Sequence, residues 1–234
     1  SRRRHTRLLT VTGVQTCALP ISGLLGWQLP GEGRVLPHAV LPALCEQARG
    51  VRWHWGRRVQ AVRPGALDLD DGQTWSVDWV LDTRGLGARP DWPLRGVRGE
   101  LLWLHAPGLE LRHPLRLMHP RHRVYLVPRP GERVVVGASE IEGEDRSPVS
   151  LRSAVELLSA AQSVLPELAE ARIVHLETQL RPALPDHRPR LSVEPGLLRL
   201  NGLYRHGWLM APALVDDALA QAGLVARPLE AVDG

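Results

Sequence analysis

The sequence predicts a mixed α/β fold in which two modules are interleaved along the chain. Residues 23–98 alternate between segments of helical and of strand-like apolar spacing. Residues 99–181 carry several strand-like segments in succession and one long amphipathic helix, which indicates an antiparallel sheet with a helix beside it. Residues 182–225 end in a short strand and a helix, and we assign them to the first module.

The first module is predicted to hold two helices and several strands. Residues 36–48 form the first helix, because Val40, Leu41 and Leu44 share one face and Pro37 suits the first turn. Alternation predicts a strand at 51–55 and further strands at 58–62, 66–69, 75–79, 77–82 and 197–200. The second helix is expected at 213–224, after Pro212.

The second module is predicted to be a sheet with one helix. The helix covers residues 150–165, because Leu151, Val155 and Leu158 recur at helical spacing between Pro148 and Pro166. A turn at 128–132 joins two of the strands. The strand-like segments lie at 100–105, 116–118, 124–127, 133–137 and 171–176.

The composition is that of an ordinary globular protein. The 234 residues are 44% hydrophobic and 23% charged, with a formal net charge of +4. All 29 basic residues are arginines spread along the chain, so no nucleic-acid partner is expected. No apolar run is long enough for a membrane span. Cys17 and Cys45 lack metal-ligand or redox spacing, and a reducing cytoplasm is the expected compartment.

The first 22 residues differ in composition from the rest. They contain four of the chain's seven threonines, and residues 11–22 look like translated sequencing-adapter read-through. A basic start with a short apolar stretch also suits a signal or transit peptide, although Thr, Gly and Gln interrupt it. We expect residues 1–22 to be non-native and disordered, the natural protein to begin further upstream, and residues 226–234 to form a tail.

Common catalytic motifs are absent from the sequence. Ser139 and Ser192 lack the surroundings of a nucleophile elbow, and the histidines lack paired metal-ligand spacing. There is no Gly-x-Gly-x-x-Gly segment and no phosphate-binding loop of the Walker type. No metal site and no catalytic side chain are therefore predicted.

Two arginine-containing loops stand out near the C-terminus. Residues 180–189 and 202–212 place Arg181 and Arg205 in segments controlled by Gly and Pro, and the second loop runs into an apolar helix start. Arginine loops beside a helix N-terminus suit an anionic small molecule or a cofactor with a polar edge.

With four further segments, these loops resemble the FAD-dependent D-amino-acid-oxidase-like (DAO) superfamily, and within it the glycine oxidases of thiamine biosynthesis, the ThiO type. The resemblance covers about residues 27–223, and its other segments are 29–33, 96–100, 124–129 and 135–139. It implies that residues 23–98 and 182–225 form an incomplete FAD-binding Rossmann-like domain. Residues 99–181 would form an antiparallel-sheet substrate-binding domain.

The resemblance also implies roles for individual residues. Arg181 would grip the substrate carboxylate with its paired donors, Tyr125 would hydrogen-bond the same carboxylate, and Arg205 would lie beside flavin and substrate. The strand-to-loop segment 82–85 stands in place of the family's second glycine loop. The implied cofactor-binding residues are Val59, Gly85, Arg205, His206, Gly207, Trp208, Leu209 and Met210, the amides of the last four facing the flavin's pyrimidine edge.

The implied activity is oxidative deamination of glycine or a related small amino acid, by hydride transfer to FAD and reoxidation by O2, in the formation of the thiamine thiazole. FAD would be non-covalent, because the C-terminal half has no cysteine. The expected partners are the amino acid, O2 and, in a homo-oligomer, further copies of the chain. Because the family's Gly-x-Gly-x-x-Gly is missing, we expect the chain as written to be a truncated fragment that binds FAD poorly or not at all. The alternatives are a D-amino-acid or sarcosine-type oxidase or dehydrogenase, and a non-catalytic carboxylate-binding remnant.

Overall fold

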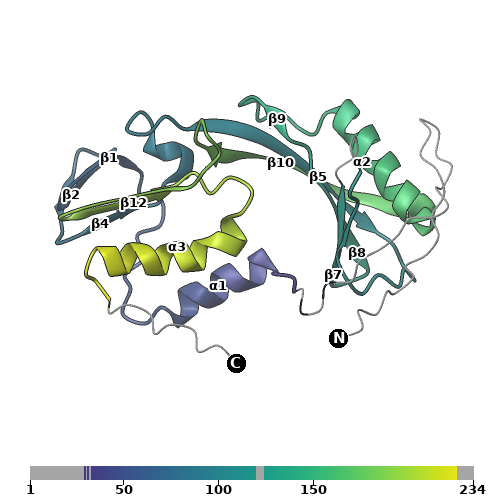
Figure 1. The fold of residues 1–234 in the computed structure, drawn as a ribbon, viewed down its shortest axis with the longest axis horizontal. Coiled ribbons are helices and arrows are strands. Elements are labelled where there is room, and N and C mark those ends of the chain that lie inside the picture. The colour runs from purple at the N-terminus through teal and green to yellow at the C-terminus, as the bar shows by residue number, and fades with distance from the viewer. Residues whose placement is uncertain (1–28, 30, 32, 120–123, 226–234) are drawn as a thin grey trace, which may run out of the picture. The chain divides into compact units, whose positions relative to one another are not determined.

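The computed structural model describes residues 29, 31, 33–119 and 124–225 (Figure 1). The segment 1–22, predicted to be disordered, and the predicted tail 226–234 lie outside the described residues. The contacts divide the described residues into two compact units, one from residues up to 34 and from 97–180, the other from 35–96 and from 181 onward. Both contain helices and strands, so the predicted mixed α/β fold is confirmed. None of the helices in the described part of the chain combines the length and apolar character that crossing a membrane requires.

The first unit is built on a six-stranded sheet. Its pairs β5–β8, β7–β8, β6–β7 and β5–β9 are antiparallel, as the succession of strand-like segments predicted. Strands β10 and β5 also continue into the second unit. The strands are, in sheet order, β10 (Arg172–Ala183), β5 (Arg95–His105), β8 (Arg133–Gly137), β7 (Tyr125–Arg129) and β6 (Leu115–Arg116), with β9 (Ile141–Glu142) paired to β5.

Helix α2 (Leu151–Val164) packs on one face of this sheet, beside β8 and β5 in Figure 1. Its buried residues Leu157, Ala160 and Ala161 share a core cluster with alternate strand residues, among them Leu102, Leu126 and Val136. Because successive strand residues point to opposite faces, the neighbours Leu101, Tyr125 and Gly137 occupy the face away from α2. The short helix η2 (Pro166–Glu170) follows α2 and adds Leu168 to the same core.

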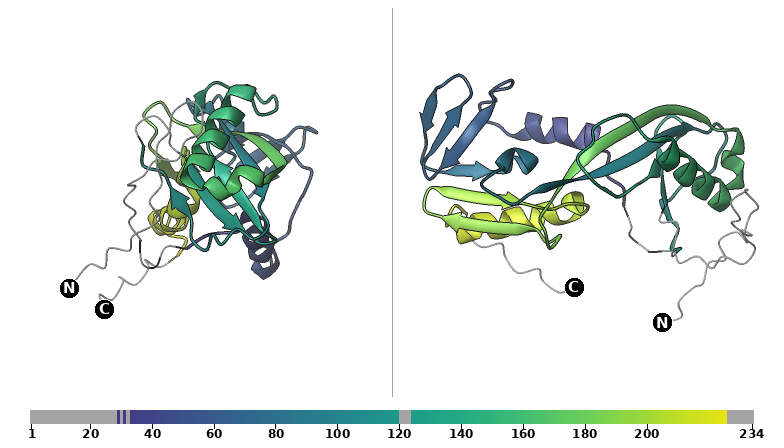
Figure 2. Two further views of the ribbon diagram at one scale, coloured as in Figure 1. Left: turned by 90° about the vertical axis from the view of Figure 1, so that its right-hand side faces the viewer. Right: turned by 90° about the horizontal axis from the view of Figure 1, so that it is seen from above.

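The second unit contains two three-stranded sheets and two longer helices. One sheet is the antiparallel β1 (Val59–Arg63), β2 (Ala66–Leu69) and β3 (Thr74–Ser76). In the other, β11 (Arg190–Glu194) pairs antiparallel with β12 (Leu197–Asn201), and β12 pairs in parallel with β4 (Val80–Asp82). Figure 2 shows α3 (Gly207–Gln221) lying along β11 and β12, and Ala218 of α3 shares a core cluster with Leu198 and Leu200. Helices α1 (Pro37–Gln47) and η1 (Gly85–Ala88) complete the unit.

The predicted strand at residues 51–55 was wrong. The segment has alternating residues, but a strand also needs a hydrogen-bonded partner, and residues 51–55 belong to no strand of the structure. Trp53 and Trp55 instead stack on each other with ring centroids 5.3 Å apart, and both are exposed.

Two elements extend six or more residues beyond their predicted bounds, and strand β11 was not predicted. Helix α3 begins at Gly207, six residues before the predicted start, with Pro212 inside it. A proline near a helix N-terminus removes only one intrahelical hydrogen bond, so it did not mark the boundary. Strand β10 covers twelve residues and extends to Ala183, beyond the predicted 171–176. Strand β11 was not predicted. It forms because it pairs with β12 in a hairpin, and its own sequence, which begins with Arg190, does not indicate this pairing.

Candidate functional site

Two glycine loops meet at one edge of the sheet formed by β11, β12 and β4. Strands β4 and β12 are parallel, so the loops after both leave from the same edge of the sheet, where α/β proteins commonly bind ligands. The Asn201 side-chain amide donates to the carbonyl oxygen of Gly85 at 3.0 Å, and the Gly202 amide donates to Asn201 Oδ1 at 2.8 Å. One side chain therefore holds the loop after β4 against the loop after β12. Asn201 was not among the predicted site residues, and no local motif singles it out.

The segment that follows Arg181 packs over Gly202. Gly202 has a φ of +77°, and a Cβ at this position would lie 2.8 Å from Leu184 Cδ1. The rings of His187 and Tyr204 have centroids 5.0 Å apart. The two arginine loops singled out in the sequence are therefore packed against each other within the second unit.

The loop after β4 is fixed by an ion pair that the sequence did not reveal. The Arg84 guanidinium donates twice to Asp82, Nε to Oδ1 at 2.8 Å and Nη2 to Oδ2 at 2.9 Å, and Asp82 is buried. Burial alone would raise the pKa of Asp82, but the hydrogen bonds from Arg84 outweigh it and the pKa lies below its ordinary value. Asp82 is therefore a carboxylate at neutral pH, and the pair holds the backbone just ahead of Gly85.

The first turn of α3 offers fewer free amides than predicted. His206 is the N-cap, and its carbonyl oxygen accepts from the amides of Leu209 at 3.1 Å and Met210 at 2.9 Å. The amides of Gly207 and Trp208 come before the first amide that donates an intrahelical hydrogen bond. Two of the four amides proposed to bind the cofactor are therefore available to a ligand. They carry the partial positive charge of the helix N-terminus.

The remaining predicted residues are distributed over both units. Arg181 is half-buried on β10, and Arg205 is exposed in the turn before α3. Val59 pairs with Leu69 on β1, in the other sheet of the second unit. Tyr125 belongs to the first unit, where it pairs with Gly137 across β7 and β8. The binding roles of these four residues stay predictions.

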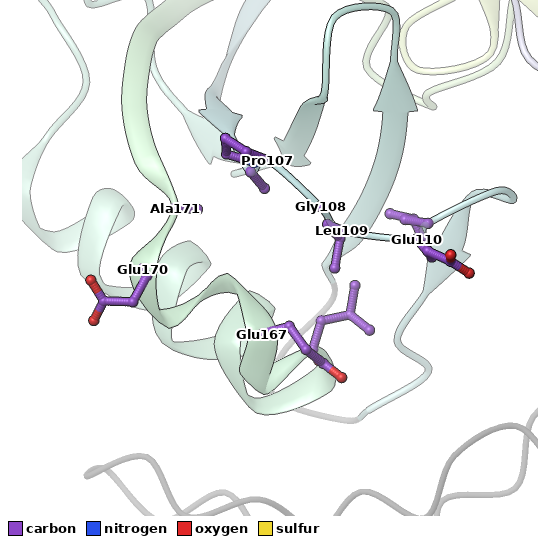
Figure 3. Close-up of a pocket in the computed structure, with 10 residues that line it drawn as sticks. Pro107, Gly108, Leu109, Glu110, Glu167, Glu170 and Ala171 are labelled. Carbon is purple, nitrogen blue, oxygen red and sulfur yellow. The ribbon is translucent and has the colours of Figure 1, made fainter.

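An open cavity of about 640 Å³ lies elsewhere in the first unit (Figure 3). Its walls come from the loop after β5, the end of α2, and η2 with the start of β10. None of the predicted site residues lines it, and Glu110, Glu167 and Glu170 would repel a carboxylate. We therefore do not assign the site here. No grouping of His, Cys, Asp and Glu among the described residues suits a metal ion.

Glycine loops at the carboxyl ends of parallel strands, together with an antiparallel sheet, are the arrangement expected from the resemblance to the flavoprotein oxidoreductases. The chain belongs to the DAO family, described as FAD dependent oxidoreductase, whose sequence model matches residues 3–220.

Individual relatives agree with this assignment. A Rhizobium etli protein named "Putative thiamine biosynthesis oxidoreductase ThiO" is 45% identical over 201 residues, covering 85% of this chain and 56% of its own length. Glycine oxidase of Geobacillus kaustophilus is 30% identical over 221 residues, covering 88% and 57%. Its crystal structure matches with a TM-score of 0.62 at 29% identity, over 76% of this chain and 50% of that one. The chain thus spans little more than half the length of these curated relatives.

Proposed function

We propose that the protein is part of an FAD-dependent oxidase of small amino acids, with glycine as its substrate and the thiamine thiazole as the pathway served. The observation that carries the proposal is the packing of the Arg181 loop over Gly202, next to the free amides of α3. Relatives named glycine oxidase and ThiO support the choice of substrate. We place the enzyme in the cytoplasm and expect it to be a homo-oligomer.

The residues at the β4 and β12 edge suit a flavin. Gly85 and Gly202 both have positive φ, and the position of a Cβ on each is taken up by the segment after Arg181, with Pro182 Cγ at 3.6 Å and Leu184 Cδ1 at 2.8 Å. The amides of Gly207 and Trp208 would hold the pyrimidine edge, with Arg205 beside them. When bound non-covalently, FAD would take a hydride from the α-carbon of the amino acid and pass the electrons to O2.

The chain's own residues would bind and orient the amino acid. The Arg181 guanidinium offers two parallel donors to the carboxylate, and the Tyr125 hydroxyl would donate a further hydrogen bond to it. A neutral amine needs no side-chain base, which agrees with the lack of a catalytic motif in the sequence. The partial positive charge on the amides of Gly207 and Trp208 would favour negative charge on a group bound beside them.

Peroxide production and carboxylate binding test the proposal together. The chain, supplied with excess FAD, is assayed for hydrogen peroxide with glycine, sarcosine and D-alanine, and for binding of glycolate by calorimetry. We expect peroxide with glycine first, and at least tenfold weaker glycolate binding for Arg181→Gln. The exposed Arg152→Gln on α2 is the matched control and should change neither.

The outcomes separate the alternatives. A preference for sarcosine or D-alanine would replace glycine by a related amine as substrate. Glycolate binding without peroxide from any of the three amines, at FAD concentrations that saturate the chain, would refute the oxidase and leave a carboxylate-binding module. Unchanged glycolate binding in Arg181→Gln would remove Arg181 from the site.

A further inference from the structure

We propose that Gly137 is a positioning residue for the substrate site. Because Gly137 has no side chain, the ring of Tyr125 can lie over it, and this determines the position of the phenol hydroxyl. The functional part of this inference rests on the proposed function, in which that hydroxyl meets the substrate carboxylate. The placement of the ring stands on the geometry of the first unit alone.

Tyr125 and Gly137 are direct partners across the antiparallel pair of β7 and β8. Directly opposite residues point their side chains to the same face, here the face away from α2. A Cβ built on Gly137 would lie 2.5 Å from the Tyr125 hydroxyl oxygen, 2.6 Å from Cζ and 2.9 Å from Cε2. The far end of the ring therefore lies over the Cα of Gly137, in the space that any other residue would fill.

A positive φ does not account for the glycine at this position. Gly137 ends strand β8, whose other residues are Arg and Val, and its peptide bond to Ala138 is cis. A glycine within a strand lowers stability unless something approaches the backbone closely. An aromatic ring laid across a glycine on the neighbouring strand is a known way in which sheets cover such a gap. The close approach at Gly137 is the ring of Tyr125.

Strand β8, which lies beneath the ring, is held in place by contacts on its other side. Gly137 pairs with Leu101 of β5 on its other side. Two residues further on, the Ser139 amide donates to the Glu100 carbonyl oxygen at 3.1 Å, and Ser139 Oγ donates to Glu100 Oε2 at 3.0 Å. Glu100 is itself held by Arg98, whose Nη2 donates to Oε1 at 2.6 Å.

In this clash we expect the tyrosine side chain to move and the paired strand to stay in place. Ordinary contacts to a Cβ are 3.4–4 Å, so a methyl group on Gly137 displaces the hydroxyl by about 1 Å or more. A misplacement of that size at a substrate-orienting group costs up to about a hundredfold in function. The expected effect is therefore a folded protein with a misplaced phenol.

The ring position can be measured directly, because the chain has only two tyrosines, Tyr125 and Tyr204. With ring-labelled tyrosine, NMR of the whole chain gives two sets of ring signals, assigned by Tyr125→Phe. We expect Gly137→Ala to shift the Tyr125 signals and leave those of Tyr204 in place. Gly33→Ala is the control, because Gly33 has no positive φ and no atom within 4 Å of its Cβ position. Unchanged Tyr125 signals in folded Gly137→Ala would overturn the inference.

A variant that unfolds is also informative. If Gly137→Ala lowers the melting temperature strongly, the clash with the ring predicts that adding Tyr125→Ala restores it. A double variant no more stable than Gly137→Ala alone would overturn the inference.

Glycolate binding tests the functional part. Gly137→Ala and Tyr125→Phe should each weaken binding about tenfold, and the double variant should be no weaker than either, because both act through one hydroxyl. Additive losses would show that Gly137 acts by another route and overturn its role. If Tyr125→Phe binds glycolate as tightly as the unchanged chain, the proposed contact of Tyr125 with the substrate is wrong. The NMR result then still tests whether Gly137 determines the position of the ring.

Discussion

Arg98 and Glu100 are the most deeply buried ion pair among the described residues. They lie two positions apart on β5, on the same face, with exposures of 4% and 0%. Glu100 Oε1 also accepts from the Ser150 amide at 2.9 Å. One carboxylate therefore joins β5, the segment after β8 and the start of α2.

Removing this charge should destabilise the protein strongly. Glu100→Gln leaves the Arg98 guanidinium buried without its counter-charge, and we expect a loss of about 3 kcal/mol in the free energy of unfolding. Urea unfolding measures it. Glu156→Gln breaks an exposed pair with Arg152 on α2 and should cost less than about 0.5 kcal/mol. Equal losses in the two variants would contradict the assignment.

The same carboxylate predicts how stability depends on pH. Burial alone would raise the pKa of Glu100 above its ordinary 4.5, but hydrogen bonds, from Ser153 first and then from Ser150, Arg98 and Ser139, lower it. A carboxyl with a depressed folded pKa stabilises above its unfolded pKa and loses that contribution as pH falls through the folded pKa. The gap in unfolding free energy between the unchanged chain and Glu100→Gln should therefore narrow below about pH 4.5. A gap of the same size at neutral and acid pH would rule this out.

Single residues were predictable from the sequence where a motif carried them. Arg181 and Arg205 stand in loops marked by Gly and Pro, and their loops do pack together. Asn201 and the Asp82–Arg84 pair escaped notice, because their roles depend on partners that only the folded chain brings near. The four amides expected at the start of α3 became two, since the helix begins earlier than Pro212 suggested.

At the scale of elements, α2 was the clearest success of local signals. An apolar stripe between two prolines predicted residues 150–165, and the helix is Leu151–Val164. Strand β8 was likewise predicted at its observed bounds. Strand β10 was predicted at half its length, because its exposed residues give no continuous apolar alternation. Its extent follows from pairing with β5, which is long-range information.

The cap of α2 gives a prediction at this scale. Ser150 Oγ accepts from the Ser153 amide at 3.1 Å, one of the donors that a helix start leaves without an intrahelical partner. Ser150→Ala should lower the free energy of unfolding by about 1 kcal/mol, measured in urea. Ser159→Ala, on the exposed side of the same helix, is the control and should be neutral or slightly stabilising. A loss in Ser159→Ala equal to that in Ser150→Ala would show that capping is not the cause.

The whole molecule draws its candidate site from distant parts of the chain. Gly85 and Asn201 form their hydrogen bond across 116 positions, and β4 pairs with β12 over a similar span. Hydrophobic periodicity identifies each strand but contains no record of such a pairing. The resemblance to a family identified the loops of the site. Only the structure shows the parallel pairing of β4 with β12, which brings the loops after these two strands to one edge of the sheet.

The same view of the whole chain predicts weak cofactor retention. FAD in dinucleotide-binding folds depends on a Gly-x-Gly-x-x-Gly turn, whose helix N-terminus meets the pyrophosphate, and the 234 residues contain no such segment. Gly85, Gly202 and the two free amides of α3 offer contacts suited to the ring system only. We expect the purified chain to carry far less than one FAD per molecule, as measured by flavin absorbance against protein concentration.

Added FAD provides the sharper form of this test. If the ring contacts at β4 and β12 exist, excess FAD should bind saturably and be lost again on gel filtration. Gly202→Ala should weaken that FAD binding, because the new Cβ would meet Leu184 and the φ at this position is positive. Gly223 also has a positive φ but lies in open space, so Gly223→Ala is the control for backbone strain alone. A yellow protein that keeps one equivalent of FAD through gel filtration would contradict the prediction, since the pyrophosphate would then be held by residues outside any known glycine turn.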